Sequence, residues 1–467
     1  MKTVCWKNVI RRLGFVGLLL GAIVLFLVGP WPTYSTGFER SGYYESSLNE
    51  LKKKAPSAEP TEDRTGLRAG WARRSIVPPA GTPLAGYGAR QGAASIGVRD
   101  EVFVKALCVG DGVDVAVIVG SDLLIVPENV ADGVRSEIAE RTSLSGDEIL
   151  FNASHNHSGP GGFAPGLVSG IFNGPFNERI PEFLVEQIVQ AIEGALESMA
   201  PAKCLSGGVD VPEFIRNRER ASAPVDSELS YLLLEKSGGE RCVVVSYSAH
   251  PTVIGSDNLE ITGEYPGFLM RSLEEMKGAE VIYLGGAVGS MGHRAPEAET
   301  PLGRSEAMGR ELAERVGRAL ESLEESEEWK REVDVESIGF PIELPPFQLR
   351  VNSHLRLSKH VLPLLGIDRD AWLQGLRIGN IVFLGMPADF CGEISVSLKA
   401  KYARSGIDLW VLSFNGDYVG YVSPDRYYND LEPDGTLGYE RGTMSWIGPN
   451  QEAYLTALTG RLVKALF

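Results

Sequence analysis

The sequence predicts an α/β fold in which layered, mixed β-sheets are flanked by helices within a single large domain. Two observations indicate this class. Short apolar runs of strand length alternate with longer amphipathic stretches from about residue 66 onward. The 467 residues, of which 43% are hydrophobic, are also sufficient to bury a large core. Because no internal repeat and no second linker interrupts this pattern, we expect residues 66–467 to form one domain.

The expected elements follow in chain order. Residues 35–65 are rich in Ser, Gly, Lys, Glu and Pro and are expected to form a flexible tether. Strands are predicted at apolar runs over residues 102–109, 115–119, 148–153, 242–248, 281–284, 378–384 and 409–412. Helices are predicted at amphipathic stretches over residues 127–142, 180–199, 264–276, 304–323, 394–403 and 450–466.

Residues 1–34 have the pattern of a signal anchor. Basic residues up to Arg12 precede an apolar run over residues 13–28, and such a basic flank is retained on the cytoplasmic side. The run is short for a full membrane span, but residues 29–31 add length at the interface. No small-x-small cleavage site follows closely, which favours an uncleaved anchor over a cleaved signal peptide. The remaining chain would then lie outside the cytoplasm, in a periplasm or at the cell surface.

Charge and cysteine content exclude several classes of protein. The net charge of −16, from 61 acidic and 45 basic residues, disfavours a nucleic acid as partner, because phosphate binding needs a clustered basic surface. The five cysteines are odd in number and include no C-x-x-C pair, which argues against a disulfide framework and against a thiolate zinc site. Any bound metal would therefore be held mostly by imidazole, carboxylate or phenol groups.

Histidine is scarce, with six in the chain, so its placement is informative. His155 and His157 lie where the predicted strand EILFNA runs into the Gly- and Pro-rich string SGPGG. On an extended chain, side chains at i and i+2 point to the same side, so both imidazoles would face one site. His250 ends the β-type run CVVVSYS and precedes Pro251. The alternatives are a hydrogen-bonded pair of surface histidines and, for His250, a satisfied core residue.

A catalytic zinc site needs about four ligands and keeps one position open for water, so oxygen donors must join the histidines. Two later strand ends supply candidates. Residues 385–393 follow the run IGNIVFL and include Asp389 and Glu393. Residues 415–422 follow the run LWVLSF and include Tyr421. Without the histidines, both segments would be ordinary polar loops.

These motifs together resemble those of the neutral ceramidase family. The string HNHSGPGG at residues 155–162 is similar to the family signature H-T-H-S-G-P-G-G. The string AHPT at 249–252 resembles the second histidine motif, PADF at 387–390 resembles P-G-E-F, and DYVGYV at 417–422 resembles the tyrosine loop. Shorter echoes occur at residues 86–88, 121–122 and 217–218. The motifs occur in family order from about residue 68 to the C-terminus, which makes the resemblance specific although each motif is short.

The resemblance implies a catalytic domain over residues 66–467 that uses Zn²⁺ to hydrolyse the amide bond of an N-acylated, ceramide-like lipid by attack of a zinc-bound water molecule. Zinc lowers the pKa of bound water to about 7, and a tunable histidine can protonate the leaving amine. The implied zinc ligands are His155, His250, Asp389 and Tyr421. The implied catalytic residues are His157 as acid/base, Ser290 and Arg218.

The sequence departs from the family pattern at two positions. The family carboxylate is usually Glu, whereas Asp389 is one methylene shorter, so Glu393 is an alternative ligand. The loop AVGSMGH around Ser290 lacks the aspartate and the proline of the family loop. Two other functions therefore remain open.

The first alternative is a metal-independent serine hydrolase or esterase that uses Ser290. Its loop follows the run EVIYL, as a nucleophile elbow would, but Val288 replaces the first glycine of G-x-S-x-G. His250 also precedes Ser290, which is the wrong order for an α/β-hydrolase. The second alternative is a catalytically inactive envelope protein that binds lipid with the same fold.

Overall fold

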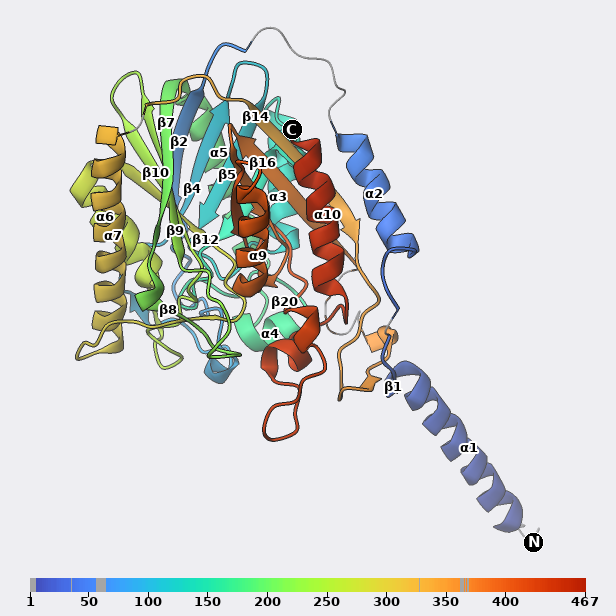
Figure 1. Ribbon diagram of the computed structural model, residues 1–467. Helices are drawn as coiled ribbons and strands as arrows, with labels where there is room; N and C mark the ends of the chain where they lie inside the picture. The colour runs from blue at the N-terminus through green and yellow to red at the C-terminus, as the bar shows by residue number, and fades with distance from the viewer. Residues whose placement is uncertain are drawn as a thin grey trace.

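The computed structural model describes residues 6–34, 36–55, 64–326, 328–361, 365, 367 and 369–467. The chain is arranged in layers: helices, an eight-stranded sheet, a four-stranded sheet and a second set of helices (Figure 1). The predicted class of layered mixed sheets flanked by helices is therefore confirmed. The four-stranded sheet lies between the larger sheet and the C-terminal helices.

The eight-stranded sheet has the order β12-β10-β9-β7-β2-β4-β5-β6. Its strands are β2 (Arg68–Ser75), β4 (Phe103–Gly110), β5 (Val115–Ser121), β6 (Ile149–Ala153), β7 (Ala200–Asp210), β9 (Glu228–Lys236), β10 (Arg241–Tyr247) and β12 (Glu280–Gly285). The pairs β5–β6 and β10–β12 are parallel, and the others are antiparallel. Strand β12 also lies beside β5 and β6, so the sheet curls until its two edge strands approach each other.

The four-stranded sheet has the order β14-β16-β17-β19, with β17 and β19 parallel. Its strands are β14 (Val335–Glu343), β16 (Asp370–Ile378), β17 (Ile381–Gly385) and β19 (Asp408–Leu412). One hydrophobic cluster joins both sheets and includes Ile118, Val244, Phe383 and Trp410. Because the opposite faces are covered by helices, the central strands are apolar on both sides and form continuous hydrophobic runs.

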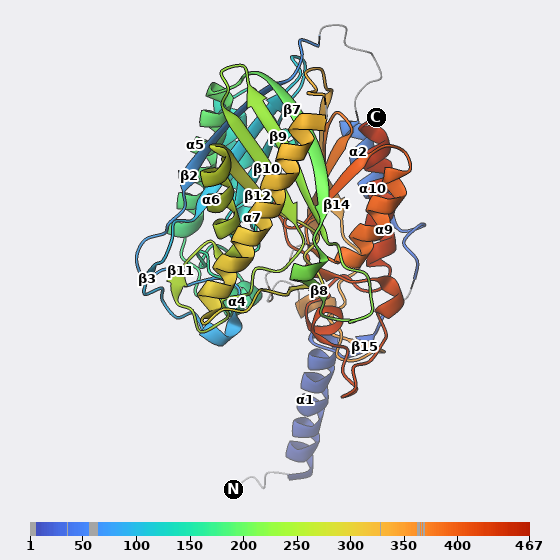
Figure 2. The same ribbon diagram turned by 60° about the vertical axis from the view of Figure 1, so that its left-hand side comes forward.

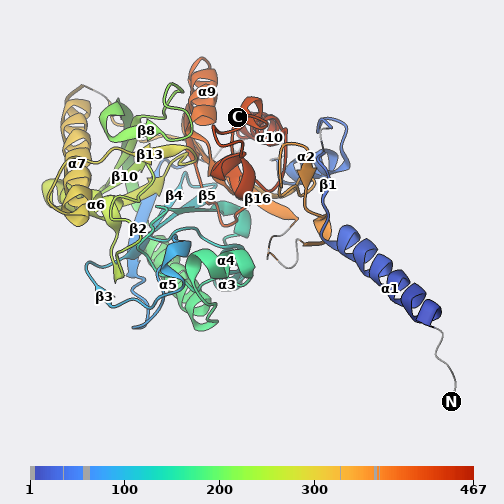
Figure 3. The same cartoon turned by 90° about the horizontal axis from the view of Figure 1, so that it is seen from below.

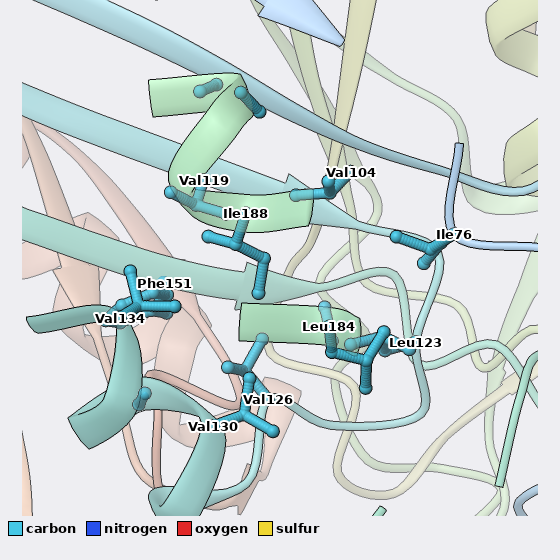
Figure 4. Packing of buried hydrophobic residues seen from close by; sticks show 14 of the residues in the cluster. Ile76, Val104, Val119, Leu123, Val126, Val130, Val134, Phe151, Leu184 and Ile188 are labelled. Atoms are coloured by element: carbon cyan, nitrogen blue, oxygen red, sulfur yellow. The ribbon is translucent and has the colours of Figure 1, made fainter. Parts of the chain in front are cut away.

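Helices cover the outer faces of both sheets (Figures 2 and 3). They are α3 (Glu128–Arg141), α5 (Arg179–Glu197), α6 (Glu264–Lys277) and α7 (Pro301–Ser326) on the larger sheet, and α9 (Gly392–Ala403) and α10 (Gln451–Ala465) on the smaller one. Figure 4 shows part of the cluster that they cover, with Val134 of α3 beside Phe151 and Leu184 of α5 beside Leu123. Complete burial of such a side chain contributes about 1.5–3 kcal/mol.

Every strand and helix expected from apolar runs and amphipathic stretches is present, with ends displaced by a few residues. One predicted strand divides, because Ile378 ends β16 and the chain turns at Gly379 before β17. The sequence patterns did not indicate β2, β7, β9, β14 or β16. Strand β7 (APAKCLSGGVD) has small and polar residues of low β propensity, and it is held by pairing with β9.

Short two-stranded pairs shape the loops at one end of the sheets. They are β3 (Gly97–Val98) with β11 (Glu260–Ile261), β8 (Ile215–Asn217) with β13 (Met291–His293), and β18 (Asp389–Phe390) with β20 (Tyr421–Val422). The short helix α4 (Leu167–Asn173) lies among the same loops. The pair β18–β20 carries two of the predicted site residues, Asp389 and Tyr421.

The N-terminal apolar helix α1 (Trp6–Leu27) extends away from the sheets in Figures 1 and 2. Its window Ile10–Leu27 has a mean hydropathy of 2.1 and none of it is buried, so it has the length and composition of a signal anchor or signal sequence. The chain beyond it returns to the domain where β1 (Trp31–Pro32) pairs with β15 (Leu355–Arg356). Phe26 O also accepts a hydrogen bond from Ser358 Oγ at 2.9 Å.

The expected tether over residues 35–65 is partly wrong, because helix α2 (Gly42–Lys54) forms within it. Ser41 caps the helix, and Ser47 Oγ accepts a hydrogen bond from Glu343 N of β14 at 2.9 Å. The physical reason is an apolar face, with Leu51 buried, that packs on the smaller sheet and on α10 despite a polar overall composition. Residue 35 and residues 56–63 of the predicted tether lie outside the described residues.

Candidate metal centre

Asn152 ties together three strands at the end of the sheets where the site is built. Its side chain is fully buried, accepts from Gly285 N at 2.7 Å and donates to Gly285 O at 3.0 Å and Ser413 O at 2.8 Å. The carboxyl ends of β6, β12 and β19 are thereby held side by side. The loops that follow these strands bring His155, Ser290 and Phe414 into one region.

His155 lies just beyond β6 and is 4% exposed. Its Nδ1 lies 2.9 Å from Leu124 O, and its ring stacks on Phe414 with centroids 4.3 Å apart. Because the carbonyl can only accept, Nδ1 carries the proton and Nε2 is left as the free electron pair. The expectation of an extended H-x-H segment is wrong, because His155 has a left-handed φ of 62°. This turn still directs its Nε2 toward the second histidine.

His157 stands beside it, with Nε2 only 3.2 Å from His155 Nε2. The Tyr87 ring packs against the His157 ring at 4.8 Å. Arg90 donates to His157 O at 2.6 Å and to Ala85 O at 2.8 Å, so it fixes the two loops relative to each other. His157 is therefore clamped between the loop that carries Tyr87 and the rest of the histidine cluster.

His250 follows β10 and reaches the same point from the other side. Its backbone N donates to Met291 O at 2.8 Å, and its Nδ1 lies 2.7 Å from Val288 O. As in His155, the carbonyl partner leaves Nε2 unprotonated and directed into the cluster. The nearest ring nitrogens of His155, His157 and His250 all lie within 4.8 Å of one another.

Asp389 completes the centre of the cluster. It is 1% exposed, and its Oδ1 lies 3.5 Å from His155 Nε2 and 3.5 Å from His250 Nε2. Its Oδ2 accepts a hydrogen bond from Tyr418 OH at 2.6 Å. Among the described residues, Oδ1 has no hydrogen-bond donor although it is buried. An unsatisfied buried carboxylate oxygen is costly unless a cation balances it.

Tyr421 and Arg218 border the cluster next to His250. Tyr421 OH lies 3.3 Å from His250 Nε2 and accepts a hydrogen bond from Arg218 Nη2 at 2.9 Å. Arg218 Nη2 is also 3.4 Å from His250 Nε2. The sequence motifs therefore bring His155, His157, His250, Asp389, Tyr421 and Arg218 into one site, although they come from distant parts of the chain.

The spacing of these donors fits a tetrahedral ion. Zinc–ligand bonds of about 2.0–2.1 Å imply ligand atoms about 3.3 Å apart. Tyr421 OH lies 3.3 Å from His250 Nε2, and Asp389 Oδ1 lies 3.5 Å from the Nε2 atoms of His155 and His250, which are separations close to this value. Imidazole, carboxylate and phenol groups are suitable ligands for zinc. The orphaned Oδ1 of Asp389, between two unprotonated Nε2 atoms, is the observation that most directly indicates a cation.

Burial also shifts the pKa values of the histidines and of Asp389. It lowers the pKa of His155 to about 3 and holds the pKa of His157 and His250 well below the usual histidine value. The three imidazoles are thus neutral, which is the form that binds a metal. Burial also raises the pKa of Asp389 to about 7, although the Tyr418 hydrogen bond and the Arg218 charge oppose this shift.

Ser290 and Glu393 lie outside the donor cluster. Ser290 follows β12 with a left-handed φ of 63°, but strand β13, not a helix, comes next. Its Oγ donates to Glu440 Oε2 at 2.5 Å, and it has no hydrogen bond to a histidine among the described residues. Glu393 is paired with Arg426 and accepts from Tyr427 OH at 3.3 Å. Asp389, and not Glu393, therefore faces the histidines.

A cavity of about 460 Å³ opens from these donors. Its wall is mostly apolar and includes Ile125, Val168, Phe172, Met444 and Trp446, while His155, His157, Asp389 and Tyr421 line the same cavity. This volume is within the range of small-ligand sites. The arrangement places polar, cation-binding groups beside a surface suited to a hydrocarbon chain.

Sequence patterns assigned no role to Asn152, Tyr418 or Glu440, although each contacts the site. Tyr418 lies within the tyrosine loop and could have been noticed by its position three residues before Tyr421. Asn152 precedes the first histidine motif, but its contacts with Gly285 and Ser413 depend on the curl of the sheet. Glu440 belongs to none of the recognised motifs.

The chain is similar to known proteins in part of its sequence and in its fold. Residues 70–283 match the family described as neutral/alkaline non-lysosomal ceramidase, N-terminal. The fold is similar to that of a neutral ceramidase from Pseudomonas aeruginosa, with a TM-score of 0.71, 18% identity, and coverage of 86% of this chain and 75% of that one. It is equally similar to a ceramidase complexed with C2, with a TM-score of 0.70, 18% identity and the same coverage. The curated proteins contain no match. Residues 70–283 therefore match the N-terminal part of the neutral/alkaline ceramidase family, and the chain shares the fold of the two ceramidases.

Proposed function

We propose that this protein is a zinc-dependent amidohydrolase that cleaves the amide bond of an N-acylated, ceramide-like lipid. The observation that carries the proposal is the meeting of His155 Nε2, His250 Nε2 and Asp389 Oδ1 at 3.5 Å separations beside an apolar cavity. The match of residues 70–283 to the neutral/alkaline ceramidase family supports the same reaction class.

In this proposal His155, His250, Asp389 and Tyr421 hold the zinc ion. When bound, such an ion acidifies water and polarises a carbonyl group, which supplies the nucleophile and the electrophile for amide hydrolysis near neutral pH. The protein's part is to fix the donors. Leu124 O and Val288 O orient the two imidazoles, and Tyr418 orients Asp389.

His157 is the proposed acid/base: as a neutral imidazole it would accept the proton that the attacking water loses and pass it to the leaving amine. An amide nitrogen leaves poorly as an anion, so a proton must reach it during bond cleavage. The Nε2 of His157 lies 3.2 Å from His155 Nε2, and His157 lines the cavity in which the scissile bond would lie. The apolar wall binds the hydrocarbon part of the substrate and excludes bulk water from the site.

The test is metal dependence measured on the purified full-length protein in detergent. Zinc is quantified by elemental analysis, and turnover is followed with a fluorogenic N-acyl amide before and after a strong chelator. We expect near-stoichiometric zinc, loss of turnover on chelation and recovery on addition of Zn²⁺. Activity that survives complete zinc removal would support the serine hydrolase that the sequence leaves open. Bound zinc without turnover of any N-acyl amide or ester would support the inactive lipid-binding alternative.

We also propose that α1 is an uncleaved signal anchor that holds the domain outside the cytoplasm. The support is the exposed apolar window Ile10–Leu27 with basic residues before it. Intact mass measurement on protein isolated from membranes tests cleavage. Protease access from the outer side of intact cells tests orientation. A mature protein that begins after residue 34, or a domain that protease cleaves only after the cytoplasmic membrane has been opened, would overturn this part.

A further inference from the structure

A buried carboxylate outside every recognised motif lies next to the site. Glu440 is 1% exposed and belongs to a π-helical turn, η6 (Tyr439–Thr443). Such turns are rare and are frequently found at functional sites. Its Oε1 accepts from Arg218 Nε at 2.5 Å, and its Oε2 accepts from Ser290 Oγ at 2.5 Å. Both oxygens of the carboxylate are therefore held, each by a different part of the chain.

Arg218 connects this carboxylate to the donor cluster. While Nε is held by Glu440, Nη2 donates to Tyr421 OH at 2.9 Å. Arg218 N also donates to Ser290 O at 2.8 Å, so the backbone at the base of the side chain is fixed too. A long arginine side chain has many rotamers, and a carboxylate on one edge of the guanidinium selects the one that reaches Tyr421.

Charge gives a second reason for Glu440. A guanidinium 3.4 Å from His250 Nε2 would repel a cation bound by the same nitrogen. Glu440 supplies the opposite charge to Arg218, and its hydrogen-bond partners are Arg218 and Ser290, not the donors themselves. Removing this carboxylate would leave Arg218 as an uncompensated positive charge beside the site.

The contacts of Ser290 are accounted for by the same arrangement. Its hydroxyl proton is directed to Glu440, and its oxygen accepts from Cys391 Sγ at 3.4 Å. A serine that donates to a carboxylate and accepts from a thiol is not paired with a histidine base, as a catalytic nucleophile would be.

We propose that Glu440 is a positioning residue, which holds Arg218 against Tyr421 and balances its charge, and that Ser290 orients Glu440. Only the expected change in kcat rests on the proposed hydrolase function. The expected change in metal affinity follows from the geometry of Arg218, Tyr421 and His250.

The decisive variant is Glu440→Gln, which keeps the volume and can keep both hydrogen bonds, because the Ser290 hydroxyl can accept from an amide. Zinc affinity is measured by competition with a chromogenic chelator, and kcat and KM are measured with a fluorogenic N-acyl amide. We expect zinc affinity to fall roughly tenfold and kcat to fall roughly 10–100-fold, the usual range for residues that orient metal ligands, with KM changed little. Ser290→Ala should act in the same direction by up to about tenfold, the effect of one hydrogen bond.

The double variant E440Q/S290A should be no worse than E440Q alone, because the two residues act through one contact. Glu274→Gln is the matched control, since Glu274 accepts from buried Lys105 at 2.5 Å, and it should leave zinc affinity and kcat unchanged. Near-UV circular dichroism checks folding. If E440Q does not fold, the zinc affinity of Ser290→Ala decides, and a wild-type value overturns the proposal.

Wild-type zinc affinity and kcat in a folded E440Q also overturn it. Loss of all turnover in S290A, with E440Q active, would instead identify Ser290 as a nucleophile. If the wild-type protein hydrolyses no amide, the proposed function fails, but the comparison of zinc affinity between E440Q and E274Q still decides the role of Glu440.

Discussion

Gly86→Ala should displace His157 without changing its chemistry. Gly86 has a φ of 101°, and a Cβ built there would lie 2.7 Å from His157 Cγ, 3.0 Å from His157 Cβ and closer still to Nδ1. Carbon atoms in contact normally lie about 3.5–4.0 Å apart, so the imidazole must move by about 1 Å. A displacement of that size can lower a rate by about 10²-fold when the group must be aligned with the reacting atoms.

The same substitution carries a backbone cost that must be separated from the clash. A non-glycine residue on the left-handed side of φ costs about 1–2 kcal/mol. Gly81→Ala is the matched control, because Gly81 has a φ of 84° and no heavy atom lies within 4 Å of the added Cβ. Both variants should lose stability by about this amount in denaturant unfolding, whereas kcat should fall only in Gly86→Ala.

The assay is kcat on an N-acyl amide, with zinc content measured on the same preparations. Gly86→Ala should keep its zinc, and combining it with His157→Ala should give no further loss beyond His157→Ala alone. Wild-type kcat in a destabilised Gly86→Ala would refute the inference that Gly86 sets the position of a catalytic His157. Loss of zinc from Gly86→Ala or His157→Ala would show that His157 binds the metal instead of acting only as acid/base.

Three further predictions follow from the site and its surroundings. His155→Ala and His250→Ala should each abolish zinc binding and turnover, since each removes one of the two Nε2 atoms that lie 3.5 Å from Asp389 Oδ1. Full metal content in both variants, measured by elemental analysis, would contradict the proposed zinc site. Tyr418→Phe removes the 2.6 Å hydrogen bond to Asp389 and should weaken zinc binding roughly 10–100-fold in a chelator competition; an unchanged affinity would show that the bond does not orient the carboxylate. Burial raises the pKa of Asp122 to about 6, so the folded state binds this proton more tightly than the unfolded state, and the stability gained below pH 4 is lost as pH rises through 6. The wild-type protein should lose about 1 kcal/mol more unfolding free energy between pH 5 and pH 7.5 than Asp122→Asn, as measured by urea denaturation at both pH values. An equal loss in the two proteins would contradict the raised pKa of Asp122.

The elements that could be predicted are those whose pattern is local. The apolar run 115–119 and the amphipathic stretch 180–199 indicate β5 and α5, because burial on both faces produces a continuous apolar run and burial on one face produces a periodic pattern. Strand β7 could not be found this way, since its pairing with β9 and not its composition makes it a strand. Helix α2 was missed for the related reason that a short apolar face is hidden in a polar segment.

The site residues also divide into those indicated by local sequence patterns and those defined by tertiary contacts. His155, His157 and His250 were recognisable because scarce residues occur in short motifs at strand ends. Glu440 was not, because a glutamate in the sequence gives no sign that it will be 1% exposed and paired with Arg218 from a distant loop. Candidate metal ligands and acid/base residues can be recognised in the sequence by their residue type and their motifs. Residues that orient them can be recognised only from their tertiary contacts.

Backbone strain at the site follows from the requirement that strand ends deliver side chains to one point. His155, Ser290 and Phe414 follow β6, β12 and β19, and they have φ values of 62°, 63° and 65°. A non-glycine residue in this region costs of order 1–3 kcal/mol, and such residues persist only where the surrounding structure fixes them. Here Asn152 fixes all three strand ends, and Leu124 O and the Phe414 ring fix His155. On an extended chain the imidazole of His155 would stand roughly perpendicular to the sheet, whereas at the left-handed turn its Nε2 lies 3.5 Å from Asp389 Oδ1. The strained backbone is therefore needed to assemble the cluster. Its energetic cost is offset by the hydrophobic core buried between the two sheets.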